Sequence, residues 1–152
     1  MSAEGKRRIL VPFTGGALDP AVLQAAIRIA RAEEAVLVPA YLILVPFEFT
    51  LEAPLKREVE VAMPLLDAVE HAALRAGVPV DARIERGRTL RDALQRLWQL
   101  EPFDRIIVPA DRTPGYLGFT EDDFAWILTH APTETLVLKP APPDGSGPEV
   151  QA

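Results

Sequence analysis

The sequence predicts an α/β fold, namely a single, doubly wound, five-stranded and mainly parallel sheet with four helices. Apolar runs typical of buried strands alternate four times with segments whose hydrophobic residues recur at helical spacing, and a fifth apolar run closes the series. The chain has 152 residues, of which 49% are hydrophobic, enough for one domain with a buried core. We expect this domain at residues 1–140 and a disordered Pro/Gly-rich tail at residues 141–152.

The first strand is predicted in the apolar run RRILVPF, which ends at Phe13 and is followed by Gly15 and Gly16. A continuous apolar run is typical of a parallel strand that is buried on both faces. Asp19 followed by Pro20 then predicts the start of a helix, because aspartate caps free amides and proline fits the first helical position.

The second strand is expected in AVLVPAYLILV, which contains Pro39. Proline removes a ladder donor from a central strand, so we expect a bulge there or a strand that begins at Ala40. The stretch PFEFTLEAP is predicted to be a loop. The next helix should end at Gly77, and Pro64 should kink it or mark where its regular part begins. Its predicted buried face comprises Val59, Met63, Leu66, Val69 and Ala73.

The remaining elements follow the same alternation. VPVDARIERG, residues 78–87, alternates apolar and polar side chains, which is typical of an edge strand. Capping boxes formed by Thr89 with Asp92 and by Thr120 with Asp123 predict the starts of two helices. The predicted fourth and fifth strands are DRIIVPAD and ETLVLK.

The composition excludes several classes of function. The net charge of −6 and a pI near 4.9 argue against nucleic acid or an anionic membrane as the main partner. The absence of cysteine rules out thiol catalysis, and the only serines, Ser2 and Ser146, lie in the tails, which excludes a serine hydrolase. His71 and His130 are far apart in sequence, which argues against a transition-metal site. The sequence has no signal-peptide or membrane-spanning pattern, so we expect a cytoplasmic protein.

In a sheet of this kind, ligands bind beyond the carboxyl ends of the strands, where the winding switches direction. The residues of this crevice that could contact a ligand are Thr14, Gly15, Gly16, Ala110, Asp111, Arg112, Gly115 and Gly118. Arg88 and Arg112 are the cations of the predicted crevice loops and would be the partners of any bound anion.

Two features of the crevice have more than one interpretation. The pair Gly15–Gly16 either points amides at an anion or only makes the tight strand-to-helix turn. Gly115 and Gly118 precede a helix start, where many folds hold a phosphate, but the acids Glu121–Asp123 would repel one. These acids favour the helix dipole and cap its amides. Alternatively, they hold Mg²⁺ together with Asp111, or they recognise a protein partner or a cationic ligand.

Four stretches have an order and spacing that match those of a known protein family: RRILVPFTGG, ERGRT, DRIIVPAD and ILTHAPTETLVLKP. In these stretches the chain resembles the universal stress protein (UspA-like) family, from Arg7 to Lys139. The resemblance implies a Rossmann-like, five-stranded α/β sandwich that is usually a dimer through the last strand. It also implies a nucleotide crevice, because some members of the family bind ATP there.

The chain departs from the motif of the family's ATP-binding members. Those members carry an aspartate after the first strand, where this chain has Thr14. Their Gly-x-x-Gly after the fourth strand corresponds to Ala110 and Thr113, and their Gly-Ser or Gly-Thr pair corresponds to Glu121 and Asp122. No register of the glycines restores the full motif, so the resemblance implies a degenerate nucleotide crevice.

We therefore expect a non-enzymatic, regulatory or stress-response protein that binds ATP weakly or not at all and needs no cofactor. One alternative is an ATP-binding nucleotide switch or slow ATPase that uses ATP with Mg²⁺. Its site would comprise Gly15, Gly16, Arg112 and Gly115 through Gly118. The other alternative is a pure protein-interaction module with the acidic helix start as its surface. The sequence names no protein partner, and the expected homodimer contact comprises Thr135, Leu136, Val137, Leu138 and Lys139.

Overall fold

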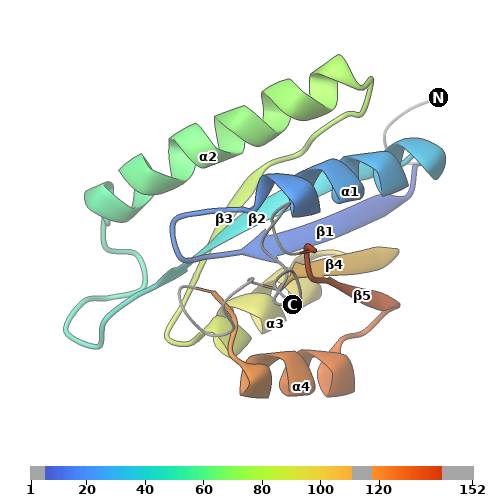
Figure 1. Ribbon diagram of the computed structural model, residues 1–152. Helices are drawn as coiled ribbons and strands as arrows, with labels where there is room; N and C mark the ends of the chain where they lie inside the picture. The colour runs from blue at the N-terminus through green and yellow to red at the C-terminus, as the bar shows by residue number, and fades with distance from the viewer. Residues whose placement is uncertain (1–5, 111–117, 142–152) are drawn as a thin grey trace, which may run out of the picture.

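The computed structural model describes residues 6–110 and 118–141 (Figure 1). Strands and helices alternate along them in the predicted order. The elements are β1 (Arg8–Phe13), α1 (Pro20–Ala32), β2 (Val36–Leu44), α2 (Lys56–Arg75), β3 (Arg83–Gly87), α3 (Leu90–Leu100), β4 (Arg105–Pro109), α4 (Glu121–His130) and β5 (Thr135–Leu138). All but the first residue of the tail predicted at residues 141–152 lies outside the described residues, as do the predicted site residues Asp111, Arg112 and Gly115.

The five strands form one sheet in the order β3-β2-β1-β4-β5, and every neighbouring pair is parallel. This confirms the predicted doubly wound fold. The winding changes direction between β1 and β4, which places the switch point at their carboxyl ends. In the part of the chain that the structure describes, no helix is both long and apolar enough to cross a membrane.

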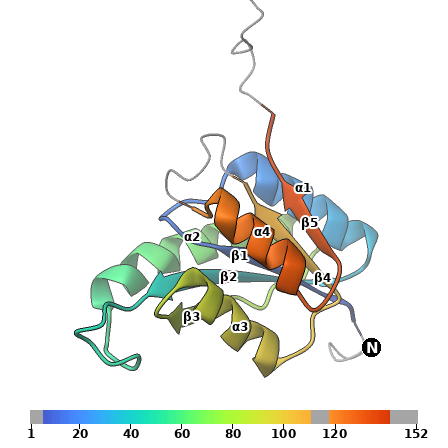
Figure 2. The same ribbon diagram turned by 90° about the horizontal axis from the view of Figure 1, so that it is seen from below.

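The helices cover both faces of the sheet, with α1 and α2 on one face and α3 and α4 on the other (Figures 1 and 2). Side chains of β1 alternate between these two layers. Leu10 packs in the core beneath α3 and α4, whereas Ile9 and Val11 pack beneath α1 and α2. The continuous apolar run of the first strand is thus explained by burial on both faces.

The expected bulge or late start of the second strand was wrong, because β2 continues through Pro39. Leu37 N donates to Pro79 O and Leu37 O accepts from Asp81 N, both at 2.9 Å, so alternate residues of β2 face β3. Pro39 is one of them, and its missing N–H leaves a gap in that ladder. The gap also explains why the predicted third strand, residues 78–87, was too long. The strand is regular only from Arg83, and Val80 forms an isolated bridge.

Helix α2 also corrects two details of the prediction. Pro64 lies inside an uninterrupted helix and does not mark its beginning. It is exposed, on the side of the helix where water can bond the carbonyl that proline leaves free. Met63 is exposed as well, and Ala62 is buried in its place, whereas the predicted Leu66, Val69 and Ala73 are confirmed as buried.

The predicted helix starts are largely confirmed. Thr120 and Asp123 form a reciprocal capping box, with bonds of 3.1 and 3.0 Å. Thr89 caps α3 by accepting from Asp92 N at 3.0 Å. The second half of that predicted box is wrong, because the Asp92 carboxylate accepts from Arg88 N at 3.1 Å. The Asp92 carboxylate therefore binds the backbone of Arg88, the residue before the cap, and not that of Thr89.

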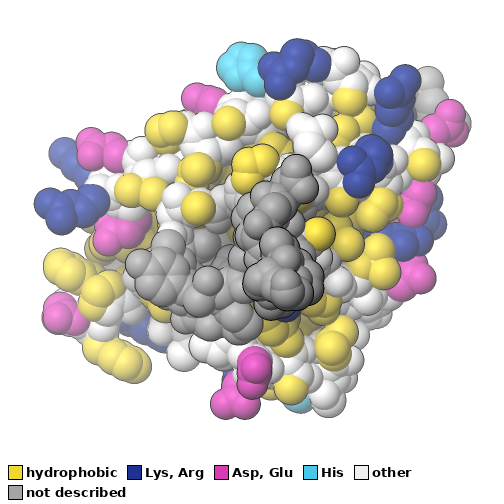
Figure 3. Space-filling model, viewed as in Figure 1, with side chains coloured by type: hydrophobic (Ala, Val, Ile, Leu, Met, Phe, Trp, Pro, Cys, Tyr) yellow, Lys and Arg dark blue, Asp and Glu magenta, His cyan; other side chains and the backbone are white. Residues whose placement is uncertain are grey.

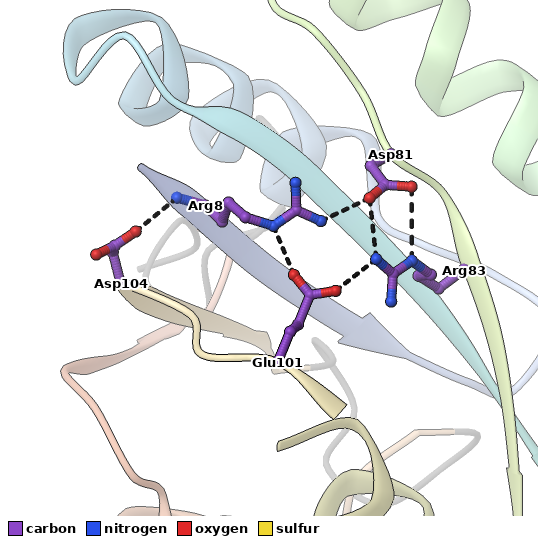
Figure 4. Close-up of polar contacts among 5 residues, drawn as sticks. All are labelled: Arg8, Asp81, Arg83, Glu101 and Asp104. Carbon is purple, nitrogen blue, oxygen red and sulfur yellow. Dashed lines mark hydrogen bonds and ion pairs between the residues drawn. The ribbon is translucent and has the colours of Figure 1, made fainter. Parts of the chain in front are cut away.

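Charged side chains join the amino ends of the strands, opposite the switch point (Figure 4). Arg8 in β1 binds Asp81 and Glu101, each at 2.5 Å, and its backbone N–H donates to Asp104 at 2.8 Å. Arg83 in β3 binds the same two carboxylates. The hydrogen bond from Arg83 is the main cause that lowers the pKa of Asp81. This network connects β1, β3 and the end of α3 without taking part in the crevice.

Candidate functional site

The candidate crevice lies where β1 and β4 separate at their carboxyl ends. Their ladder pairs Ile9 with Arg105 and Leu10 with Ile106, and then stops. In the continued register, Pro12 would donate to the carbonyl of residue 107, and Pro109 would donate to the carbonyl of Pro12. Neither proline has an N–H, so both strands lack the donors that would close the gap. Two prolines that face each other thus open the switch point.

The opening is nevertheless filled by side chains. The cavity between the strand ends has a volume of about 10 Å³, close to the space of one water molecule. It is lined by Phe13, Thr14, Ala17, Leu18, Asp19, Pro109, Ala110, Gly118 and Phe119. The structure therefore brings together three of the predicted site residues, Thr14, Ala110 and Gly118. Gly15 and Gly16 do not line this cavity.

Two polar groups of the turn after β1 already have partners within the protein. Thr14 Oγ1 donates to Leu42 O at 2.9 Å, and Gly16 N donates to the Tyr41 hydroxyl at 3.0 Å. Gly15 and Gly16 have φ angles of +85° and +82°, in the left-handed region that favours glycine. The glycine pair therefore makes the strand-to-helix turn, and the amide of Gly16 is bonded to β2.

The acids at the start of α4 differ in their surroundings. Asp123 closes the capping box, and its other oxygen lies 3.5 Å from Arg91 Nε on α3. Glu121 and Asp122 are exposed, where their charge favours the helix dipole. Among residues 6–110 and 118–141, no three histidine or acidic side chains are grouped as a metal site. Asp111, the further candidate ligand of the magnesium interpretation, is outside the described part.

Arg88 has a role that the sequence did not indicate. Its Nη1 donates to Val45 O at 3.2 Å and to Pro46 O at 2.6 Å, and its guanidinium lies 5.4 Å from the Phe47 ring centre. Arg88 thus binds the loop between β2 and α2 and does not line the cavity at the switch point. No local signal could have found this, because the partners are more than 40 residues away in the sequence.

Aromatic side chains form a stack on the α3–α4 layer. The rings of Trp98 and Trp126 stack at 5.6 Å, and His130 stacks on Trp126 at 4.9 Å. The Arg91 guanidinium lies 5.7 Å from the Trp126 ring centre. The stack joins α3 to α4 and covers the sheet beside Phe119, so it supports the crevice wall and does not open into the cavity.

Comparison with known proteins gave matches among solved structures only. No family model matches the sequence, and no curated protein matches it. A universal stress protein family member from Burkholderia pseudomallei is 20% identical, with a TM-score of 0.62 over 88% of this chain and 96% of the other. A universal stress protein in complex with cAMP is 22% identical, with a TM-score of 0.63 over 88% and 97%.

A third match is a universal stress protein family member from Arabidopsis thaliana with AMP bound. It is 12% identical, with a TM-score of 0.59 over 91% of this chain and 97% of the other. The matches span nearly whole chains, so the order of strands and helices agrees throughout. At such low identity the matches establish the fold alone. The chemistry of the site has to be argued from this chain's own residues. The chain therefore has the fold of the universal stress proteins.

Proposed function

We propose that this chain is a universal stress protein-like, non-enzymatic regulatory or stress-response protein that binds ATP weakly or not at all. The observation that carries the proposal is the filled switch point. The cavity there holds about 10 Å³, far less than the hundreds of Å³ of a usual ligand pocket. Thr14 and Gly16 support the same conclusion, since their donor groups are bonded to β2.

Electrostatic repulsion acts in the same direction. Glu121 and Asp122 occupy the first turn of α4, beside Phe119 of the cavity wall. A carboxylate about 7 Å from a phosphate costs roughly 1–2 kcal/mol at an effective dielectric of 20–40. Two such groups lower the affinity on the order of a hundredfold.

The second candidate function is an ATP-binding switch or slow ATPase. Two of the similar structures contain a nucleotide, cAMP in one and AMP in the other. For this chain, the candidate residues are Gly15, Gly16 and Gly118, with Arg112 and Gly115 outside the described part. The third candidate, a pure protein-interaction module, is favoured by the exposed Glu121 and Asp122.

Calorimetric titration of ATP, with and without Mg²⁺, tests the proposal after the protein has been checked for co-purified nucleotide. We expect no heat at millimolar ATP in either condition. Binding at micromolar affinity would contradict the proposal and support the switch. The double variant Glu121→Gln/Asp122→Asn is the control. It separates the effect of the small cavity from the repulsion between these two carboxylates and the ATP phosphates. We expect no heat from it either, whereas binding by this variant alone would assign the lost affinity to the two acids.

We also propose that the chain forms a homodimer through β5. β5 is the last strand of the sheet order, so one of its edges has no neighbouring strand among the described residues. An apolar edge strand readily pairs with another chain. Val137 supports this, because its side chain is 39% exposed on that strand.

A further inference from the structure

A groove lies at the amino ends of β4 and β5, next to the end of α3. It has a volume of about 450 Å³ and is bounded by the last turn of α3, the segment before β4 and the segment before β5. Glu101, one of its polar lining residues, is bound by Arg8 and Arg83, so its charge is already paired. The apolar residues of the lining are Trp98, Leu100, Pro102, Phe103 and Pro132.

Much of this apolar lining is open to solvent. Leu100 is 66% exposed, and Pro102 and Pro132 are exposed as well. The ring of Trp98 is held in place by its stack on Trp126, with ring centres 5.6 Å apart. Fixed grooves lined by aromatic and other apolar side chains are typical of sites that bind proline-rich segments in the polyproline II conformation. The groove therefore fits an extended segment of this composition.

The chain has such a segment directly after β5, where residues 140–143 read Pro-Ala-Pro-Pro. Proline fixes φ near the polyproline II value, which reduces the entropy lost on binding. The segment cannot reach the groove of its own chain. Thr133 lines the groove, and Pro140 follows seven residues later at the opposite end of β5, about 23 Å away along an extended strand. Four residues of polyproline II span only about 12 Å.

The open edge of β5 can bring the segment of a second copy to the groove. Ile106 N donates to Glu134 O and Ala110 N donates to Leu138 O, both at 2.9 Å. Because the peptide groups of alternate residues face opposite edges of a strand, Val137 directs its N–H and carbonyl away from β4. Two copies related by a two-fold axis can form a ladder along this edge only when they run antiparallel. An axis along the strands would place each N–H opposite its own copy.

We propose that residues 140–143 of each copy dock in the groove of the other copy. This inference rests on the homodimer through β5 that is proposed above. In an antiparallel pair, the carboxyl end of one β5 lies beside the amino end of the other. An axis at Leu136 or at Val137, the two central residues of β5, places the partner subunit's Pro140 within one residue of Thr133. The proline segment of the partner therefore begins where the groove begins.

The partner's segment needs to pass only β5 to enter the groove. Neighbouring strands lie about 4.8 Å apart, so the partner's β5 would be roughly 10 Å from β4, within the reach of four residues. The face of the molecule that carries β5 has hydrophobic side chains open to solvent (Figures 1 and 3). Docking covers the exposed part of Leu100, and the two-fold axis makes this contact twice in each dimer. The exchange thus strengthens the dimer.

The cysteine-free chain allows a direct test by cross-linking. The variants Gln99→Cys, in the groove, and Asp144→Cys, directly after the proline segment, are purified separately, mixed until subunits have exchanged, and treated with a short bis-maleimide. We expect a product of twice the 16.6 kDa chain mass, formed more in the mixture than in either variant alone. Gln24→Cys, at an exposed position of α1, is the matched control and should not cross-link to Asp144→Cys.

Substitutions in the groove and in the segment test whether the cross-link reports docking. Leu100→Ser in the groove partner should remove most of the product, without loss of folding because that side chain is mainly exposed. Leu74→Ser, at a side chain that is also 66% exposed, should leave the product unchanged. Pro142→Ser/Pro143→Ser in the other partner should remove it as well. A product that persists with Leu100→Ser, or that is no greater than in the Gln24→Cys control, would overturn the proposal.

Sedimentation velocity separates this exchange from the homodimer through β5. We expect the Pro142→Ser/Pro143→Ser protein to remain a dimer, with a Kd at least tenfold higher than that of the wild type. A dimer with an unchanged Kd would overturn the exchange and leave the homodimer standing, whereas a wild-type monomer at micromolar concentration would overturn both. A chain that carries both Gln99→Cys and Asp144→Cys is finally diluted into excess wild type. A cross-link within that single chain would overturn the exchange, because its own segment would then fill the groove.

Discussion

At the residue scale, Thr14 shows how a polar group of the candidate crevice can serve the fold itself. Its hydroxyl bonds the carbonyl of Leu42 at the end of β2. Thr14→Val leaves that part-buried carbonyl without its donor, so we expect a loss of about 1 kcal/mol in the free energy of unfolding. Urea denaturation measures it, with Thr129→Val as the control, since Thr129 makes the same kind of bond on the exposed face of α4. An equal loss in both variants would show that Thr14 has no special structural role.

Gly87 is the second residue whose role is decided by its immediate surroundings. A Cβ there would lie 2.6 Å from Ala93 N and 2.9 Å from Ala93 Cα, against the backbone of α3. We expect Gly87→Ala to lower stability by about 1–3 kcal/mol, because β3 and α3 must move apart. Gly77→Ala is the matched comparison, since an added methyl meets nothing within 4 Å but φ is +77°. Its expected loss is about 1 kcal/mol. A smaller loss for Gly87→Ala than for Gly77→Ala in urea would contradict the steric explanation.

At the scale of single elements, the sequence predicted what depends on near neighbours. The cap at Asp19 and the box at Thr120 could be recognised because their bonds span two or three residues. The effect of Pro39 could not be recognised. Whether the position of its missing N–H is turned toward β3 depends on the register that the sheet adopts. The role of Arg88 depends on a loop more than 40 residues away, which local periodicity cannot show.

The network at the amino ends of the strands predicts a pH dependence. The pKa of Asp81 is lowered in the folded state, mainly by the hydrogen bond from Arg83 and then by that from Arg8, against the effect of burial. The unfolded state binds a proton on this group more readily, with a pKa near 4. Asp81 therefore contributes stability above that value, and the contribution is lost as the pH falls through the lowered folded value.

We accordingly expect Asp81→Asn to be less stable than the wild type at neutral pH, with a difference that shrinks as the pH falls below about 4. Urea midpoints at pH 7 and pH 3 measure it. Asp67→Asn, an exposed substitution on α2, provides the reference for the general effect of removing one charge. A difference that is the same at both pH values would show that Asp81 acts through packing and not through its charge.

At the scale of the whole molecule, the alternation of apolar runs and helical patterns was enough to predict the architecture, because burial dictates both periods. The same alternation predicted the position of the crevice. It could not predict that only about 10 Å³ remains there, because the volume left between the strand ends depends on side chains from distant parts of the chain, such as Leu18 and Phe119. The architecture is thus shared with the universal stress proteins, whereas the volume at the switch point follows from this chain's own side chains.

The edge of the sheet at β5 gives the last prediction. Val137→Lys places a charge on the exposed side of β5, where a second chain would pair, so we expect it to convert the proposed homodimer to a monomer. Sedimentation velocity at micromolar concentration measures the change. Leu74→Lys on α2 adds the same charge at another exposed hydrophobic position and should leave the dimer intact. A Val137→Lys protein that remains dimeric would show that the dimer contact does not involve the exposed side of β5.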